Sequence, residues 1–302
     1  IVKNLNKTYD SKNSKKVNAL KNFNLEVKEG EIFGLLGPNG AGKSTFINIL
    51  AGTAIKSSGN IEVWGFDLDK NPRQSKASIG IVPQEVNIDP FFNPKDLLEL
   101  QAGLYGVKKK DRITDTILKM VSLEDQAETY SRSLSGGMKR RLMVAKALVH
   151  QPPIVILDEP TAGVDVELRK NLWNNVKDLN RNGVTIILTT HYLHEAEEMC
   201  DRIGILDKGK LVALDTTKNL INKIQTKIVS FKLNKNIIIN NESINNLQII
   251  SNSNNLLTVS YEKSKLLIDD IINYIKDQKI DILDISTDDG DLEDVFLKLT
   301  KH

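Results

Sequence analysis

A glycine-rich segment near the N-terminus has the composition of a phosphate-binding loop. It reads Gly37-Pro38-Asn39-Gly40-Ala41-Gly42-Lys43-Ser44-Thr45. Consecutive backbone N–H groups in such a loop surround a polyphosphate, and glycine avoids clashes at close approach. A helix that begins near Lys43 would point its N-terminus at the anion. Lys43 would then reach the β- and γ-phosphates, and the Ser44 hydroxyl would bind Mg²⁺. The spacing of this segment predicts a nucleotide-binding site.

Two acidic residues, Asp158 and Glu159, follow the apolar run Ile154-Val155-Ile156-Leu157. A carboxylate at the end of a buried strand in a P-loop protein lies at the phosphate crevice. Asp158 is predicted to hold Mg²⁺ and Glu159 to act as general base on a water. The second acid favours hydrolysis over transfer to an acceptor. The alternative is a pair of acids that only end a strand.

The segment Leu134-Ser135-Gly136-Gly137-Met138 carries a third candidate. A serine and two glycines at a helix start offer backbone N–H groups and a hydroxyl to an anion. A capped helix over residues 139–147 explains the same residues without any ligand. Spacing alone leaves both interpretations open.

The elements around these segments predict an α/β fold. Residues 32–36, 154–157 and 184–188 are apolar, β-branched runs typical of central parallel strands, and residues 166–180 form an amphipathic helical pattern between two of them. Residues 95–130 have helical periodicity and little strand character. From about residue 218 the composition becomes rich in Asn, Ile and Lys.

The C-terminal part, residues 218–302, is predicted to be a small α/β accessory domain, after a first domain of residues 1–217. Its expected strands are residues 226–233, 255–261 and 280–286, its helices 263–276 and 291–301, and the Asn-rich stretch 236–245 is an expected loop.

Taken in order, GPNGAGKST, Gln84, LSGGM, ILDEP, TAGVD and TTH resemble the ATP-binding subunit of ABC transporters over about residues 1–217. The resemblance implies a P-loop ABC ATPase fold: a parallel-sheet core, an antiparallel β subdomain, and a helical subdomain at about residues 90–145. It also implies ATP hydrolysis with Mg²⁺.

The resemblance gives roles to further residues. Gln84 would contact Mg²⁺ or the attacking water, and His191 the γ-phosphate. Asp165 would lie at a subunit interface, and Tyr9 would stack on adenine. Leu134, Ser135, Gly136 and Gly137 would complete the ATP site of a second ATP-binding subunit, most simply another copy of this chain.

Finer features, namely Met138, the string HYLHEAEEMCDRIGILDKGKLVALDT and the ending LEDVFLKLT, resemble the ABC-2 type exporters, including YadG-like and daunorubicin-resistance-like ATPases. That branch works with a separate multispan permease, and no run here approaches the roughly 18 apolar residues of a membrane span. The chain would then be held peripherally at the cytoplasmic face, with residues 95–130 receiving the permease.

Net charge and cysteine content limit the classes of partner and of covalent structure that this chain can have. A net charge of +2 in 302 residues gives no global basic field, so no nucleic acid is expected as partner. The single cysteine, Cys200, excludes an internal disulfide and is expected in the core. Two other classes of protein share some of these motifs: a translation-factor-like or DNA-repair ABC ATPase, and a P-loop kinase for a small metabolite.

Overall fold

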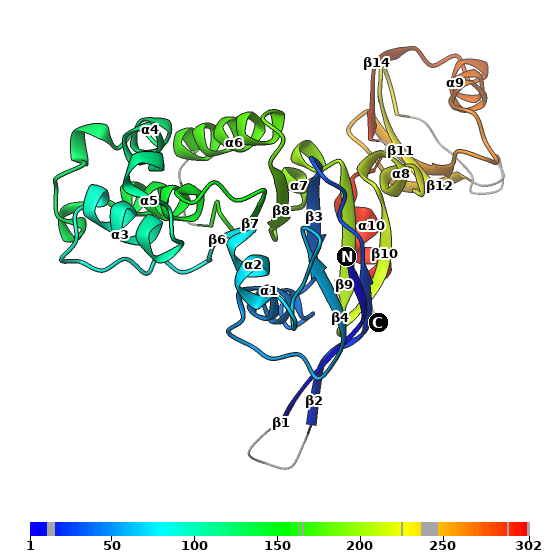
Figure 1. Ribbon diagram of the computed structural model, residues 1–302. Helices are drawn as coiled ribbons and strands as arrows, with labels where there is room; N and C mark the ends of the chain where they lie inside the picture. Colours follow the sequence, from blue (N-terminus) through cyan, green and yellow to red (C-terminus); the bar gives the residue numbers. More distant parts are fainter. Residues whose placement is uncertain are drawn as a thin grey trace. The chain divides into compact units, whose positions relative to one another are not determined.

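The computed structural model describes residues 1–10, 16–162, 164, 166–224, 226–236, 247–288 and 290–300. The chain divides into two compact units, Ile1–Thr216 and Thr217–His302 (Figure 1). Of the predicted features, Asp165 and nearly all of the Asn-rich stretch lie outside the described residues.

The centre of the first unit is a sheet with the order β10-β9-β3-β8-β7-β6. Neighbouring strands are parallel, except that β10 runs antiparallel to β9. Every residue of β3 and β8 is buried, which explains why both strands are continuous apolar or β-branched runs. The strands are β3 (Ile32–Leu36), β6 (Ile79–Val82), β7 (Ile154–Asp158), β8 (Thr185–Thr189), β9 (Arg202–Asp207) and β10 (Lys210–Thr216).

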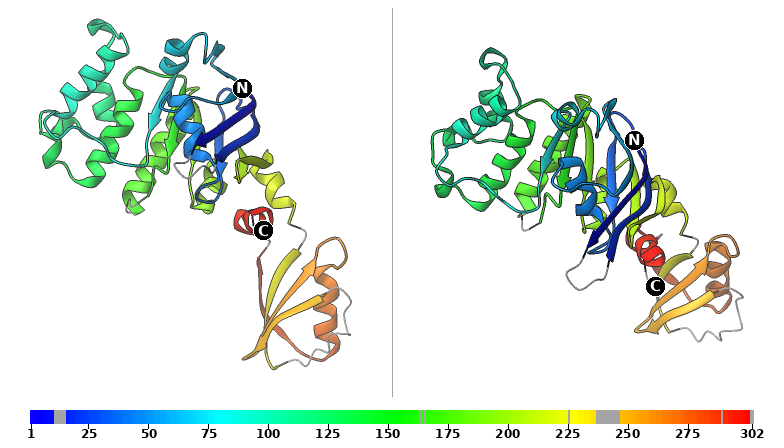
Figure 2. Two further views of the ribbon diagram at one scale, coloured as in Figure 1. Left: turned by 90° about the horizontal axis from the view of Figure 1, so that it is seen from below. Right: turned by 60° about the horizontal axis from the view of Figure 1, so that its bottom comes forward.

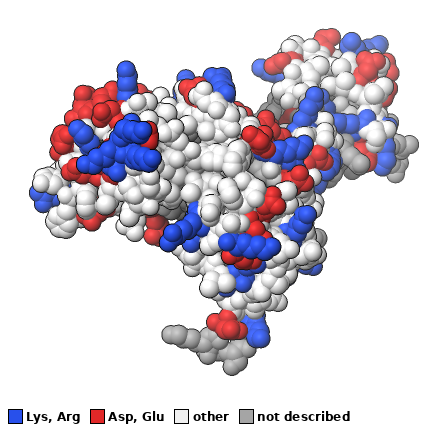
Figure 3. Space-filling view, in the orientation of Figure 1, with Lys and Arg blue, Asp and Glu red and all other residues white. Residues whose placement is uncertain are grey.

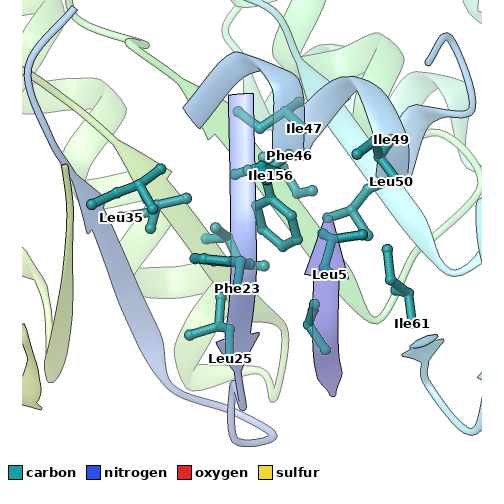
Figure 4. Close-up of a cluster of buried hydrophobic side chains, with 14 of the residues drawn as sticks. Leu5, Phe23, Leu25, Leu35, Phe46, Ile47, Ile49, Leu50, Ile61 and Ile156 are labelled. Atoms are coloured by element: carbon teal, nitrogen blue, oxygen red, sulfur yellow. The ribbon is translucent and has the colours of Figure 1, made fainter. Parts of the chain in front are cut away.

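A second, antiparallel sheet has the order β2-β1-β4-β5. Its inward side chains meet α1 and the central sheet in one apolar cluster, in which Phe23 and Phe46 lie with ring centroids 5.1 Å apart (Figure 4). This cluster fixes α1, and therefore the end of the glycine-rich loop, against both sheets. The elements are β1 (Val2–Asp10), β2 (Lys16–Leu25), β4 (Ser58–Val63), β5 (Phe66–Asp67) and α1 (Lys43–Ala51).

Helices α3, α4 and α5 pack on one another at one end of this unit, away from the antiparallel sheet (Figure 2). They confirm the helical character that periodicity predicts around residues 95–130. The helices of the unit are α2 (Pro72–Ala77), α3 (Pro94–Leu104), α4 (Thr114–Met120), α5 (Gly136–Leu148), α6 (Val166–Arg181) and α7 (Leu193–Met199), with short 3₁₀ turns at Lys109–Asp111, Glu124–Gln126 and Ser131–Ser133.

The second unit is built on an antiparallel sheet of order β12-β13-β11-β14, and α9 packs on this sheet through an apolar cluster to which the sheet contributes Val229 and Phe231 and the helix contributes Ile275. The expected strand at 226–233 is confirmed, whereas β12 was not predicted, and α9 begins five residues later than expected because residues 263–265 form a turn. The elements are α8 (Thr217–Asn222), β11 (Thr226–Leu233), β12 (Leu247–Ser253), β13 (Leu256–Glu262), α9 (Ile268–Asp277), β14 (Ile282–Asp288) and α10 (Leu292–Thr300).

Candidate nucleotide site

The glycine-rich loop joins β3 to α1, as predicted, and its glycines are required by the chain itself. A Cβ built on Gly37 would lie 2.3 Å from the carbonyl oxygen of Leu206. Gly42 has φ +116°, and a Cβ there would lie 2.6 Å from the carbonyl oxygen of Ala19. Both distances are below any real contact, so these two glycines hold the loop against neighbouring backbone before any phosphate is considered.

Lys43 is the first residue of α1 and is only 8% exposed. Its Nζ donates to the carbonyl oxygens of Gly37 (2.6 Å) and Pro38 (3.3 Å). Burial lowers the pKa of the Lys43 ammonium, while the nearby carboxylates of Glu159 and Asp158 oppose that change. The ammonium is thus a desolvated donor at the loop. An anionic oxygen would interact with it more strongly there than in water.

The carboxyl ends of β6, β7 and β8 lie side by side and carry the other polar candidates. Asp158 ends β7, and its Oδ1 accepts a hydrogen bond of 2.5 Å from the Thr189 hydroxyl at the end of β8. The pKa of the Asp158 carboxyl is raised, chiefly by burial and also by Glu159; the bond from Thr189 acts in the other direction.

Two of the residues predicted to be catalytic, Gln84 and His191, converge on the carboxylate of the third, Glu159. Oε2 of Glu159 accepts a hydrogen bond from Nε2 of Gln84 at 2.8 Å and lies 3.3 Å from Nδ1 of His191. The Glu159 side chain is 12% exposed, while that of His191 is 48% exposed. Glu159 has φ +47°, an unusual backbone conformation that its N–H stabilises by donating to the carbonyl oxygen of Thr189 at 3.0 Å.

Lys43, Gln84, Glu159 and His191 line one pocket of about 570 Å³, whereas Asp158 lines a different groove. The pocket brings the glycine-rich loop together with Gln84, Glu159 and His191, as predicted from motifs more than a hundred residues apart. Its remaining wall comes from residues that sequence analysis missed. The lining residues are Val17, Asn18, Ala19, Lys21, Asn39, Gly40, Ala41, Gly42, Lys43, Ser44, Thr45, Gln84, Glu159, His191 and Lys208.

Tyr9 is not among those lining residues. It lies in β1, where the residue is 38% exposed and the centroid of its ring is 4.4 Å from Nζ of Lys7. Its neighbour across the strand pair, Val17, lines the pocket instead. No sequence motif marks Val17, Lys21 or Lys208, which reach the pocket only because β2 and the β9–β10 turn pass beside the glycine-rich loop.

The segment after Leu134 forms a capped helix start. Ser135 is the N-cap of α5, and its Oγ accepts a hydrogen bond from the Met138 N–H at 3.2 Å. This segment does not line the pocket of its own chain. A Cβ built on Gly136 would have no heavy atom within 4 Å. The part of the chain that the structure describes therefore has no steric need for glycine at that position.

A buried carboxylate, missed by sequence analysis, supports the segment before His191. Glu195 is 2% exposed and accepts hydrogen bonds from the hydroxyls of Thr161 (2.8 Å) and Thr190 (3.3 Å). Nε of Arg169 lies 3.4 Å from its second oxygen. Glu195 therefore ties α6, the turn after Glu159 and the residue before His191 to one another.

The donor set suits magnesium. The Ser44 hydroxyl, the Gln84 amide and the Asp158 carboxylate offer the hard oxygen ligands that Mg²⁺ prefers, at the edge where phosphate oxygens would supply the rest. Among the described residues, no group of three or more His, Cys, Asp or Glu side chains forms a metal site by itself.

Comparison with known proteins places this site in a family. The family model for ABC transporters matches residues 20–162. The linearmycin resistance ATP-binding protein LnrL of Bacillus subtilis (strain 168) is 40% identical over 73% of this chain and 70% of its own length. The Nod factor export ATP-binding protein I of Neorhizobium galegae is 43% identical over 66% of this chain, but only 58% of its own length.

Solved structures of similar fold are also ATP-binding cassettes. The ATP-binding cassette MJ0796, in a dimeric post-hydrolysis state bound to ADP and Pi, has a TM-score of 0.64 at 29% identity and covers 71% of this chain and 97% of its own. An ATP-binding subunit of an ABC transporter has a TM-score of 0.66 at 29% identity over 74% of this chain and 91% of its own.

The chain belongs to the ABC transporter family, within which it is an ATP-binding and ATP-hydrolysing subunit. The resemblance and the P-loop ABC ATPase fold that the motifs predict are both confirmed. Among the residues that the structure describes, no helix combines the length and the apolar character needed to cross a bilayer.

Proposed function

We propose that this chain is the ATPase subunit of an ABC-2 type export complex. The names of its relatives support export: one confers linearmycin resistance and others export Nod factors. Several relatives, such as the one from Rhizobium etli, are matched over less than two thirds of their length (65%), so the whole assembly belongs to the proposal. The exported substrate would be bound by the permease.

The observation that carries the proposal is an incomplete site. The pocket holds the P-loop, Gln84, Glu159 and His191, while Ser135 and Gly136 lie elsewhere on the same chain. A second ATP-binding subunit, arranged head to tail, would bring its Ser135 turn over the nucleotide. The open space at Gly136 fits this arrangement, because its glycine is then needed for close approach from outside. The solved MJ0796 cassette is itself dimeric.

In this proposal the nucleotide is ATP with Mg²⁺. The loop amides and Lys43 hold the phosphates, Ser44 and Asp158 hold the metal, and Gln84 positions the water or the metal. Glu159 takes a proton from the attacking water, and His191 contacts the γ-phosphate. Thr45 and the main chain of residues 37–42 complete the phosphate-binding site of the glycine-rich loop. Binding of ATP favours the closed dimer. Hydrolysis to ADP and phosphate allows the dimer to reopen.

A groove of about 460 Å³ between α1, α3 and α5 is the proposed docking place for the permease. Asn87, Tyr105, Met143 and His150 are among the residues that line it. Lys/Arg and Asp/Glu side chains are interspersed on the face shown in Figure 3, which gives no extended basic surface for nucleic acid. The chain would then sit on the cytoplasmic face of the membrane through its permease.

The test is affinity purification of the tagged chain from detergent-solubilised cells of its own organism, with ATPase activity measured on the same sample. We expect a multispan membrane protein to co-purify. Recovery of ribosomes or DNA in its place would contradict the proposal and support the non-transport alternative.

A further inference from the structure

One buried guanidinium lies beneath the loops that carry Gln84 and Glu159 and is not among the residues that line the nucleotide pocket. Arg140 lies on α5 and is 6% exposed. Among the described residues, its hydrogen-bond acceptors are all backbone carbonyl oxygens. These are Pro83 (2.9 Å) and Gln84 (2.7 Å) from Nη1, Glu159 (2.6 Å) and Asp158 (3.5 Å) from Nη2, and Pro160 (3.0 Å) from Nε.

The acceptors belong to two loops that must be placed accurately for hydrolysis. Pro83 and Gln84 directly follow β6, while Asp158 to Pro160 end and follow β7, its parallel neighbour. The same guanidinium therefore fixes the main chain on both sides of the Gln84–Glu159 hydrogen bond. Only arginine has the planar fork with five N–H donors that this arrangement uses.

Burying a charged group costs desolvation free energy, which the surroundings of Arg140 must offset. Burial lowers the pKa of Arg140, and the carboxylates of Asp158 and Glu159 compensate through space. The bonded carbonyl dipoles add to that compensation. An apolar residue would fill the volume more cheaply, but it would leave the loop carbonyls unsatisfied.

Arg140 also connects these loops to the Ser135 turn. Ser135 caps the same helix, and five residues of α-helix span about 7.5 Å. The helix beyond Arg140 is held in the core by Leu142, Ala145 and Leu148, each at most 4% exposed. The Ser135 turn and Arg140 are therefore joined by a continuous stretch of α-helix.

We propose that Arg140 is a positioning residue that holds Gln84 and Glu159 in place relative to the Ser135 turn, so that the hydrolytic step depends on its five-donor fork and nucleotide binding does not. This inference rests on the proposed function, in which the Ser135 turn of one subunit contacts the nucleotide of the other. A shift of that turn would then change the position of the general base within its own chain.

The test compares Arg140→Lys with Arg141→Lys in the full-length chain. The first keeps the charge and loses the fork. The second is a matched control, since Nη1 of Arg141 donates to the carbonyls of Val121 (2.8 Å) and Ser122 (2.6 Å), away from the catalytic loops. Steady-state ATPase, affinity for a fluorescent ATP analogue and the thermal midpoint are measured for each. Arg140→Gln, which has two donors and no charge, is measured alongside.

We expect Arg140→Lys to lower kcat by about 10- to 100-fold while the affinity for the analogue changes less than about twofold. Arg141→Lys should leave kcat within about twofold of the wild type. In a Gln84→Ala background, the effect of Arg140→Lys should shrink, because residues that act through one another are not additive.

Two results would overturn the inference alone: an active wild type whose Arg140→Lys variant keeps its kcat, or loss of folding and nucleotide binding together in both Arg140 variants, which would make the role structural. A folded wild type without any ATPase activity would overturn the proposed function and this inference with it.

Discussion

Nε2 of Gln84 donates to Oε2 of Glu159 at 2.8 Å, which joins two side chains 75 residues apart in the chain. The bond exists because β6 and β7 are parallel neighbours, so that the residues after each strand meet at the same edge. His191 lies 3.3 Å from the same oxygen. The carboxylate of Glu159 is therefore the point at which the side chains proposed to act in hydrolysis meet.

Replacement of Glu159 by Gln should stop turnover without preventing ATP binding. The amide cannot accept a proton from water, and loss of a general base costs about 10²- to 10⁴-fold in rate. We expect the variant to accumulate as an ATP-bound dimer, detected by size-exclusion chromatography with ATP. Glu198→Gln, on an exposed side chain paired with Lys177 at 3.2 Å, is the control. Normal turnover in Glu159→Gln would rule out the base assignment.

Lys43→Ala should act at the earlier step, on nucleotide affinity. A desolvated ammonium contributes about 1.5–3 kcal/mol as a charged donor, which corresponds to about 10- to 150-fold in Kd. Titration with a fluorescent ATP analogue measures this loss. Lys95→Ala, at a half-exposed lysine 3.4 Å from Glu128, should bind normally. An unchanged Kd in Lys43→Ala would show that the ammonium does not contact the phosphates.

Gly37→Ala and Gly136→Ala should separate glycines needed by the fold from glycines needed by a second subunit. A Cβ at Gly37 would meet the Leu206 carbonyl at 2.3 Å, so we expect a loss of about 2 kcal/mol or more in unfolding free energy. Gly136 has open space, and alanine in a helix gains up to about 1 kcal/mol over glycine. Chemical denaturation measures both changes.

Gly136→Ala should nevertheless lose ATPase activity, because its methyl group would collide with the nucleotide of the other subunit. A fully active and equally stable Gly136→Ala variant would argue against the head-to-tail dimer.

Folding stability should depend on pH through His150. Burial lowers the pKa of His150, although its hydrogen bond with the Ile79 carbonyl acts in the other direction; its ring stacks on Tyr105 with centroids 3.7 Å apart. The folded state thus disfavours the proton. The contribution of neutral His150 to the free energy of unfolding is therefore complete above the pKa of His150 in the unfolded chain, about 6.5. This contribution is lost as the pH falls from there toward the pKa in the folded state, at no more than about 1.4 kcal/mol per pH unit.

Urea denaturation between pH 8 and 5.5 tests this dependence. His150→Gln should flatten the fall in stability on the acid side, while His194→Gln, at an exposed ring, should leave it unchanged. Parallel curves for wild type and His150→Gln would mean that other groups cause the acid loss.

Much of the first unit could be predicted because its signals are local. The apolar runs of β3, β7 and β8, the cap at Ser135 and the glycine-rich loop each depend on a few consecutive residues. The second unit was harder to predict: β12 (Leu247–Ser253) mixes polar with apolar residues and pairs with β13 through an irregular register. Its strand character depends on that partner, which no local pattern reveals.

Residue types and spacing were enough to indicate a phosphate-binding loop from Gly37 to Thr45 and the acids Asp158 and Glu159, and the resemblance to the family added His191. The surroundings of these residues could be learned only from the folded chain. No sequence motif marks Arg140 under the two loops, Glu195 near His191, or Lys21 beside the glycine-rich loop. Their positions follow from how strands and helices distant in sequence pack together, and burial and hydrogen-bond geometry arise only from that packing.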